Sequence, residues 1–405
     1  MLTYTYTARD TATGQKVKAE VQAESEQAAA RLIQKEGLAP LEIKAKDIEG
    51  AGFRRFFNKV KTKDRVIFAR QLSTLINAGL PLVQSLRSVL AQTKSKPLQS
   101  VINSIITDVE SGKPMSEAIT KFPKVFNQVF VSLIASGETS GTLDTALERI
   151  ANQQEKDAEI MAKVKGAMTY PAIVMLVMAG VVGFMITSVL PQVETLYDGI
   201  SGVQLPLITR VLLVISHFII DYWYIVIVLF IVLGFITSKW ARTLGGKSVI
   251  DALKMRMWPI GPLFMKLYMA RFARTATTLV STGVPLIQTL EITAKAVDNV
   301  HISKSIRKAI EKVKGGKALS ASLMGDDNFL ELVPQMLKIG EDSGAIEQML
   351  EKTADYYEKE VDNQIKSIST IIEPVLMIVL GVVALIIVGA VLLPIYGLVG
   401  KSVIK

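Results

Sequence analysis

The sequence has no cysteine among its 405 residues, which excludes disulfides, thiolate metal sites and cysteine nucleophiles. Its first residues (MLTY, 1–4) form neither a basic nor an apolar segment, so we expect no signal peptide, and the first membrane span would direct insertion. A complete phosphate-binding loop is also missing. Residues 245–248 (GGKS) fit the end of G-x-x-x-x-G-K-[ST], but Ala241 stands where glycine is required and no strand precedes it. We therefore expect neither a nucleotide nor another cofactor.

Apolar residues make up half of the sequence, and two runs of them carry no charge. Residues 172–190 and 375–393 each contain 19 consecutive uncharged residues. As helices they would each span roughly 28 Å, close to the hydrocarbon thickness of a bilayer. The net charge of +9 could indicate nucleic-acid binding, but membrane proteins carry excess Lys and Arg beside their cytoplasmic ends. We predict an integral membrane protein that contacts the lipid bilayer and no nucleic acid.

An internal repeat relates residues 68–86 (FARQLSTLINAGLPLVQSL) to residues 272–290 (FARTATTLVSTGVPLIQTL). In each copy an amphipathic helix would stop at a glycine, and the next helix would start after a proline, which is the usual asymmetry of helix caps. Each copy therefore predicts a helix–turn–helix corner. The residues that we single out in the two corners are Arg70, Gly79, Pro81, Arg274, Gly283 and Pro285.

The repeat continues in two acidic turns with the pattern G-E-x-S-G. Their defining residues are Gly137, Glu138 and Gly141 in the first copy and Gly340, Glu341 and Gly344 in the second. A divalent ion at a seam is one interpretation. The favoured one is that glycine ends a helix, serine caps the next, and the glutamate satisfies free amides there. We expect Arg70 and Arg274 to pair with such carboxylates across the bundle.

The polar residues near the membrane are few. Pro171 and Pro374 stand where a helix enters each uncharged run, and we expect a kink there, near the membrane surface. His217 and Asp221 lie four residues apart, hence on one helical face. They could form a proton relay. The aromatic residues 222–224 favour instead a hydrogen-bonded pair just outside the hydrocarbon.

These features predict a mostly α membrane protein with a small N-terminal ββαβ module, three transmembrane helices and two homologous helical bundles of about six helices each. In the helix that leads to the first span, Glu148, Arg149, Lys156 and Asp157 indicate a solvated face. The predicted segments, in chain order, are a docking module (1–46), a linker (47–63), the first cytoplasmic bundle (64–170), the first span (171–191), an extracytoplasmic loop (192–221), the second span (222–238), the second cytoplasmic bundle (239–373), the third span (374–394) and an extracytoplasmic tail (395–405).

The orientation follows from the distribution of Lys and Arg. Residues 152–171, 238–257 and 354–373 together carry ten, whereas residues 191–221 and 395–405 carry three. The positive-inside rule therefore predicts that both bundles lie in the cytoplasm and that the first and third spans run outward.

The duplicated corners, the paired acidic turns, the two prolines and the N-terminal module together resemble the type II secretion F family over essentially the whole chain. That resemblance implies a multi-pass inner-membrane platform of a type II secretion system or type IV pilus. It also implies oligomerisation and no catalytic residues. The implied partners are a cytoplasmic hexameric assembly or retraction ATPase, a pilin or pseudopilin, and other inner-membrane components.

Two other classes of function remain as alternatives at this stage. Transporters and channels also contain internal repeats, but three spans are few for enclosing a midplane site. A membrane-embedded enzyme would need a nucleophile–base arrangement, and the sequence offers only His217 and Asp221. We therefore predict a non-enzymatic assembly platform, with a small-solute transporter or channel as the alternative.

Overall fold

The computed structural model describes residues 2–10, 16–23, 26–35, 37–45, 59–198 and 206–402. The chain forms two compact units, Met1–Lys61 and Thr62–Lys405, and each is considered by itself. The structure confirms the predicted class, because it is mostly helical, with three long apolar helices and a small N-terminal sheet. Most of the predicted linker and the last residues of the predicted tail fall outside the described residues.

The N-terminal unit has the predicted ββαβ order. It consists of β1 (Leu2–Asp10), β2 (Lys16–Ala23), α1 (Glu26–Lys35) and β3 (Leu38–Ala45). The three strands form an antiparallel sheet in the order β2-β1-β3. Tyr6 and Ala8 of β1 pack against Ile33 of α1 in a small core.

The first bundle contains six helices, as the sequence predicts. They are α3 (Thr62–Asn77), α4 (Leu82–Gln92), α5 (Lys96–Glu110), α6 (Met115–Thr120), α7 (Gln128–Ser140) and the first part of α8 (Leu143–Phe184). Phe68 of α3 is fully buried and lies 5.7 Å, centroid to centroid, from the ring of Phe126. The first residue shared by the two copies of the repeat is thus a core residue.

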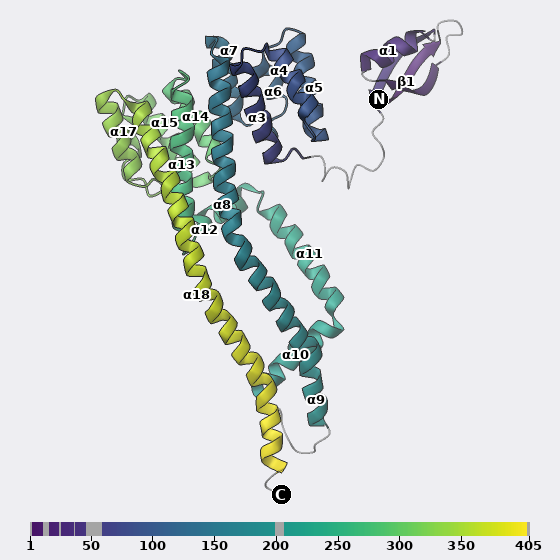
Figure 1. Cartoon of the computed structure of the whole chain (residues 1–405), viewed down its shortest axis with the longest axis vertical. Coiled ribbons are helices and arrows are strands. Elements are labelled where there is room, and N and C mark those ends of the chain that lie inside the picture. Colours follow the sequence, from purple (N-terminus) through teal and green to yellow (C-terminus); the bar gives the residue numbers. More distant parts are fainter. Residues whose placement is uncertain are drawn as a thin grey trace. The chain divides into compact units, whose positions relative to one another are not determined.

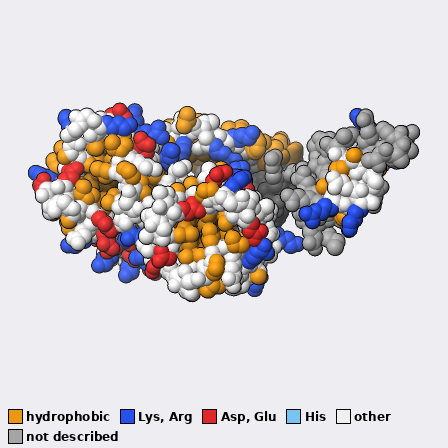
Figure 2. Space-filling model, turned by 90° about the horizontal axis from the view of Figure 1, so that it is seen from above, with side chains coloured by type: hydrophobic (Ala, Val, Ile, Leu, Met, Phe, Trp, Pro, Cys, Tyr) orange, Lys and Arg blue, Asp and Glu red, His pale blue; other side chains and the backbone are white. Residues whose placement is uncertain are grey.

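The second bundle repeats this arrangement and is preceded by α12 (Leu244–Arg256). The repeated helices are α13 (Gly261–Val280), α14 (Leu286–Ala296), α15 (Val300–Lys314), α16 (Leu319–Leu323), α17 (Leu332–Ser343) and the first part of α18 (Ile346–Ser402). Phe272 of α13 packs edge-to-face on Phe329 at 5.1 Å, which is the counterpart of the pair in the first bundle. On the ends of the bundles away from the spans, charged side chains of both signs are mixed with apolar areas (Figure 2).

Three helices within the described residues are long and apolar enough to cross a membrane: α8 with its extension to Thr195, α11 (Trp223–Trp240), and α18 up to Leu392. Each of the two bundles is continuous with a span, since α8 and α18 run from bundle to span (Figure 1). Pro171 lies inside α8 and Pro374 inside α18, and neither proline ends its helix. The kinks therefore stay predictions.

At the ends of the spans away from the bundles lies a helix, α10 (Leu207–Asp221), which precedes α11. Beyond α8 the chain makes a π-helical turn, η1 (Met185–Val189), and then α9 (Leu190–Asp198). Leu213 of α10 packs against Leu190 and Ala390, so α10 contacts both the first and the third span. The second span, α11, covers Trp223–Trp240 and so overlaps almost the whole 222–238 segment that we predicted.

Candidate functional site: the repeated motifs and the seam between the long helices

The two corners reverse the chain by the same backbone geometry. Gly79 has φ +84° and Gly283 has φ +80°, a left-handed conformation that strongly favours glycine. Pro81 and Pro285 then occupy the N-cap positions of α4 and α14. These four residues have a local structural role, since they end one helix and set the direction of the next.

The first glycine of each acidic turn lies inside a helix and does not end it. Helices α7 and α17 continue through Gly137 and Gly340 and end at Gly141 and Gly344, where φ is +73° and +71°. A Cβ atom at Gly137 would lie 2.7 Å from the Cβ of Ala146. Glycine is needed at this position because α7 and α8 approach each other closely.

The turn glutamates bind backbone amides, as the favoured interpretation predicts, but they cap the preceding short helix. The Glu138 carboxylate accepts hydrogen bonds from the N–H groups of Met115 and Ser116, at 2.5 and 3.1 Å, at the start of α6. Glu341 accepts the equivalent bonds from the first two residues of α16, at 2.6 and 3.1 Å. Both carboxylates are therefore used as helix N-caps. No cluster of three His, Asp or Glu side chains suited to a metal occurs in the described part of the chain.

Arg70 and Arg274 bind carboxylates on the long helices, so our expectation that they pair with the acidic turns is wrong. Arg70 Nε donates to Glu155 Oε1 of α8 at 2.7 Å, and Arg274 Nε donates to Glu358 Oε1 of α18 at 2.7 Å. The turn carboxylates are already occupied by amides. Each arginine therefore holds the start of its bundle to the helix that leads into a span.

These contacts shift the pKa values of the groups involved. The hydrogen bond with Glu155 raises the pKa of Arg70 above its ordinary value, and the same bond lowers the pKa of Glu155. Burial alone would lower the pKa of Arg274, but its hydrogen bonds to Glu358 and Asp355 outweigh burial and raise it. Arg70, Glu155 and Arg274 are therefore charged at neutral pH.

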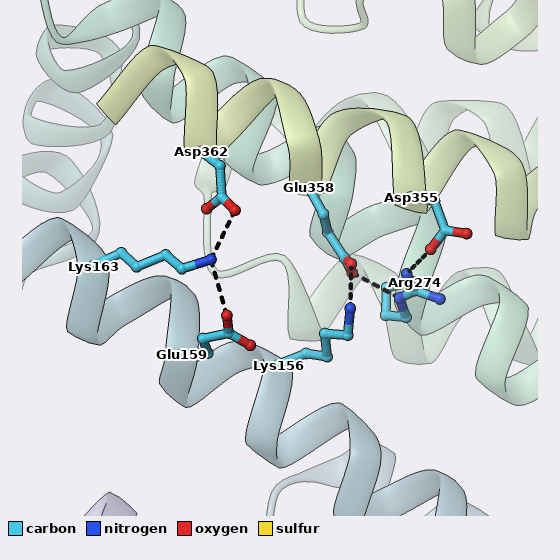
Figure 3. A network of polar contacts seen from close by, with 7 residues as sticks. All are labelled: Lys156, Glu159, Lys163, Arg274, Asp355, Glu358 and Asp362. Carbon is cyan, nitrogen blue, oxygen red and sulfur yellow. Dashed lines mark hydrogen bonds and ion pairs between the residues drawn. The ribbon is translucent and has the colours of Figure 1, made fainter. Parts of the chain in front are cut away.

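A second set of ion pairs joins the two long helices to each other (Figure 3). Lys156 of α8 lies 3.3 Å from Glu358 of α18, and Lys163 lies 2.7 Å from Asp362. Lys163 also pairs with Glu159 of its own helix at 2.9 Å, and these two hydrogen bonds raise its pKa. We call these five residues the seam. Beneath the seam, Ile160 packs in an apolar cluster with residues of α13 and α18.

A polar cavity of about 470 Å³ opens beside the seam. Its walls come from α8, α13 and α18 and include Arg149, Glu155, Arg274, Glu347 and Glu351. The cavity thus adjoins the arginine–carboxylate contacts of both repeats. The sequence does not predict this cavity, because its walls belong to different repeats.

The solvated face that we predicted on α8 holds for Glu148 and Lys156, which are exposed, whereas Asp157 is half-buried. It lines a pocket of about 300 Å³ together with Arg65 of the first bundle and Arg271 of the second. Burial raises the pKa of Asp157, whereas the positive charge of Arg271 and a hydrogen bond from Gln153 at 3.4 Å act in the opposite direction. The second bundle covers a side of α8 that looks solvent-facing when the first repeat is considered alone.

His217 and Asp221 of α10 do not bind each other as the interfacial-pair interpretation supposed. His217 Nε2 lies 2.8 Å from Glu194 Oε2 of α9, which belongs to the extension of the first span. Its neighbour Ser216 donates to the carbonyl of Ile186 in η1 at 2.5 Å. These two contacts hold α10 on the first span, and Thr209 of α10 donates to the carbonyl of Ala390 in α18 at 3.1 Å.

The fold and these contacts define a class of protein: a membrane protein in which one helical bundle and its span occur twice. The family model described as type II secretion system protein F matches residues 68–191 and again residues 272–394, and the model of its N-terminal domain matches residues 1–44. The two matches begin at the phenylalanines of the two corners.

Individual relatives extend the similarity over the whole chain. The type IV pilus assembly protein PilC of Thermus thermophilus is 37% identical, over 99% of both chains. PilC of Myxococcus xanthus is 36% identical, over 96% of this chain and 94% of the relative. The type II secretion system protein F of Pseudomonas aeruginosa is 32% identical, over 98% and 99%.

The chain belongs to the type II secretion system protein F family. This confirms the resemblance inferred from the corners and turns. The family comprises non-enzymatic membrane components of type IV pilus and type II secretion machinery, and this chain is one of them.

Proposed function

We propose that this chain is the inner-membrane platform on which a type IV pilus or type II secretion filament is assembled. It would couple a cytoplasmic hexameric ATPase to the insertion of pilin or pseudopilin into the filament, or to its removal. The names of the relatives support the assembly role, because they include both pilus assembly proteins and secretion proteins. The distribution of Lys and Arg supports a cytoplasmic location of both bundles.

The observation that carries the coupling proposal is the continuity of α8 and α18 (Figure 1). A force on either bundle would reach a span through a single helix, without a flexible connection. The seam ties these two helices together through Lys156, Lys163, Glu358 and Asp362. Movement of one bundle would therefore be transmitted to both outward spans.

The partners of this platform would act on different parts of the chain. The mixed charged surface at the far ends of the bundles is the face available to a cytoplasmic ATPase (Figure 2). Pilin and other inner-membrane components would contact the spans, and we expect the platform to form homo-oligomers. The N-terminal ββαβ unit would serve as a docking module.

The transporter alternative finds no support in the membrane region. A groove of about 280 Å³ lies between the first and third spans, and all of its lining residues, such as Val177, Val181 and Leu380, are apolar. It offers a solute no polar side chain to bind.

A deletion strain tests the assembly role. Cells without this chain should lose their filaments or their type II secretion while the ATPase is still produced, and the wild-type gene should restore them. Normal filaments and normal secretion in the deletion strain would contradict the proposal.

The absence of cysteine allows a direct test of orientation. Single cysteines can be introduced at the exposed residues Glu117 of the first bundle, Asp342 of the second and Gln192 of α9. In intact spheroplasts, a membrane-impermeant maleimide should label only Gln192→Cys. Labelling of the two bundle positions before lysis would reverse the proposed orientation.

A further inference from the structure

Helix α12 directly precedes the second bundle, and its inner face is fixed to that bundle. The Asp251 carboxylate accepts a hydrogen bond from the N–H of Val300 at 3.0 Å. Lys247 pairs with Asp298 at 2.7 Å. These contacts hold α12 against the start of α15, so the orientation of its other face is determined.

The outer face of α12 is an exposed apolar stripe. Val249, Leu253 and Met257 follow one another at intervals of four residues, so they lie on one side of the helix. Leu253 is 58% exposed, and Trp258, at the end of the stripe, is 74% exposed. An exposed row of large apolar side chains that ends in tryptophan is unusual on a surface that faces only water.

The charges around this stripe are almost all positive. Asp251 is the only carboxylate in residues 239–260, and it is buried, whereas the same segment contains five Lys and Arg residues. Lys239, Arg242 and Arg256 are exposed and form no ion pair within the part of the chain that the structure describes. The outer face of α12 therefore combines an apolar stripe with unpaired positive charge.

The position of α12 places this face at the membrane boundary. The second span ends at Trp240, and α12 begins at Leu244, only four residues later. Gly246 permits the tight return, because a Cβ atom there would lie 2.0 Å from the carbonyl oxygen of Trp240. Figure 1 shows α12 between the bundles and the spans. The helix cannot lie far from the lipid headgroups.

We propose that α12 lies in the membrane interface and binds anionic phospholipid. Val249, Leu253 and Trp258 insert at the level where headgroups meet acyl chains, and Arg242 and Arg256 bind lipid phosphate groups. A second copy of the chain fits this face less well, since a symmetric contact would bring positive charges together. This binding goes beyond filament assembly, because it fixes the level of the second bundle relative to the membrane surface.

The fluorescence of Trp258 tests the insertion. The chain has three tryptophans, so Trp223→Phe with Trp240→Phe leaves Trp258 as the only one. In proteoliposomes of phosphatidylcholine and phosphatidylglycerol, lipids brominated near the headgroup should reduce its emission roughly twofold. Quenching by aqueous acrylamide but not by brominated lipid would overturn the proposal. Shielding from both quenchers would also overturn it and would indicate protein–protein contact.

Charge reversal tests the requirement for anionic lipid. Removing phosphatidylglycerol should weaken the quenching, and Arg242→Glu with Arg256→Glu should abolish this dependence on anionic lipid. The matched control is Lys304→Glu with Lys308→Glu, which reverses two exposed charges on α15 and should keep the dependence. High salt provides a check without any charge reversal, because it should weaken the dependence by screening. The role of Arg242 and Arg256 would be refuted if neither high salt nor their reversal to glutamate changed the dependence of quenching on anionic lipid.

Discussion

Lys156 and Glu358, separated by 202 residues in the sequence, lie 3.3 Å apart between the two long helices. Glu358 also accepts a hydrogen bond from Arg274 within the second bundle. One carboxylate therefore belongs both to the internal framework of its repeat and to the contact between repeats. The corresponding Glu155 of the first repeat pairs with Arg70 and, among the residues that the structure describes, takes no part in the seam. The duplication has thus become asymmetric at this position.

This asymmetry predicts unequal costs for the same substitution in the two repeats. The side chain of Glu358 is 12% exposed, whereas that of Glu155 is 41% exposed. Glu358→Gln leaves Lys156 without its carboxylate and Arg274 with only Asp355, and should destabilise the protein by about 2 kcal/mol. Glu155→Gln should cost less than about 1 kcal/mol, because water solvates Arg70. Thermal unfolding in detergent, followed by circular dichroism, measures both. Equal costs would contradict the unequal roles.

The close approach of helices at the acidic turns predicts the effect of adding one methyl group. Gly340→Ala would place a Cβ atom 2.9 Å from the Cα of Ile346, and the backbone there cannot rotate away. We expect a loss of about 1–3 kcal/mol. Gly166→Ala is the control, since no atom lies within 4 Å of its added Cβ. It should be neutral or stabilising by up to about 1 kcal/mol, because alanine favours the helix. The melting temperature should fall for Gly340→Ala and should stay the same or rise for Gly166→Ala.

The N-cap role of Glu138 predicts that its charge matters more than that of a nearby glutamate. Glu138→Gln replaces one amide-accepting oxygen by an NH₂ group that faces an N–H donor, and should cost about 1–2 kcal/mol. Glu117→Gln removes an exposed carboxylate from the first turn of α6, the helix whose amides Glu138 binds, and should cost less than about 0.5 kcal/mol. Urea unfolding of the two variants gives the comparison. A Glu117 variant that is the less stable of the two would argue against the capping role.

Local features of the repeated motifs were predictable from the sequence. Gly79 and Pro81 end and restart helices through backbone geometry, which depends on only a few neighbouring residues. The apolar spans were equally visible, since length and composition define them. The partner of Arg70 was not visible, because Glu155 lies 85 residues further along the chain.

One signal could have found the arginine partners. Glu155 and Glu358 are separated by the same 203 residues that separate Glu138 from Glu341, so a longer comparison of the repeats would have matched them. The seam has no such signal. It arises from packing between repeats, which the alignment of one repeat on the other does not describe. The contact of the second bundle with the side of α8 that carries Asp157 also arises from packing between the repeats.

The burial of Asp157 predicts a dependence of stability on pH. Because its pKa is raised, the folded chain holds this proton more tightly than the unfolded chain does. The cost of the charge is absent at low pH, grows as the pH rises from the ordinary carboxyl range through the raised pKa, and is complete above it. Asp157→Asn should therefore raise the melting temperature at pH 7.5, by roughly 2–4 °C for each kcal/mol recovered.

Melting temperatures measured over a range of pH give the decisive comparison for Asp157→Asn. The gain from Asp157→Asn should shrink as the pH falls toward the ordinary carboxyl range. Asp342→Asn, at an exposed residue of α17, is the matched control and should produce no such trend. A gain that grows at low pH would contradict the assigned direction of the shift.

The seam yields a prediction that links structure to filament assembly. Lys163 lies between Asp362 of the other long helix and Glu159 of its own. Lys163→Asp would place three carboxylates together and push α8 away from α18, so we expect filaments per cell to fall roughly tenfold. Adding Asp362→Lys should restore assembly, because the new lysine can reach the carboxylates at positions 159 and 163. Electron microscopy counts the filaments, and immunoblots of membranes show whether each variant is present at the wild-type level.

Arg87→Glu, which breaks an exposed pair with Glu110 inside the first bundle, is the control and should leave assembly unchanged. Rescue by the double exchange requires that the two long helices act together. Normal assembly with Lys163→Asp alone would show that the seam does not transmit force.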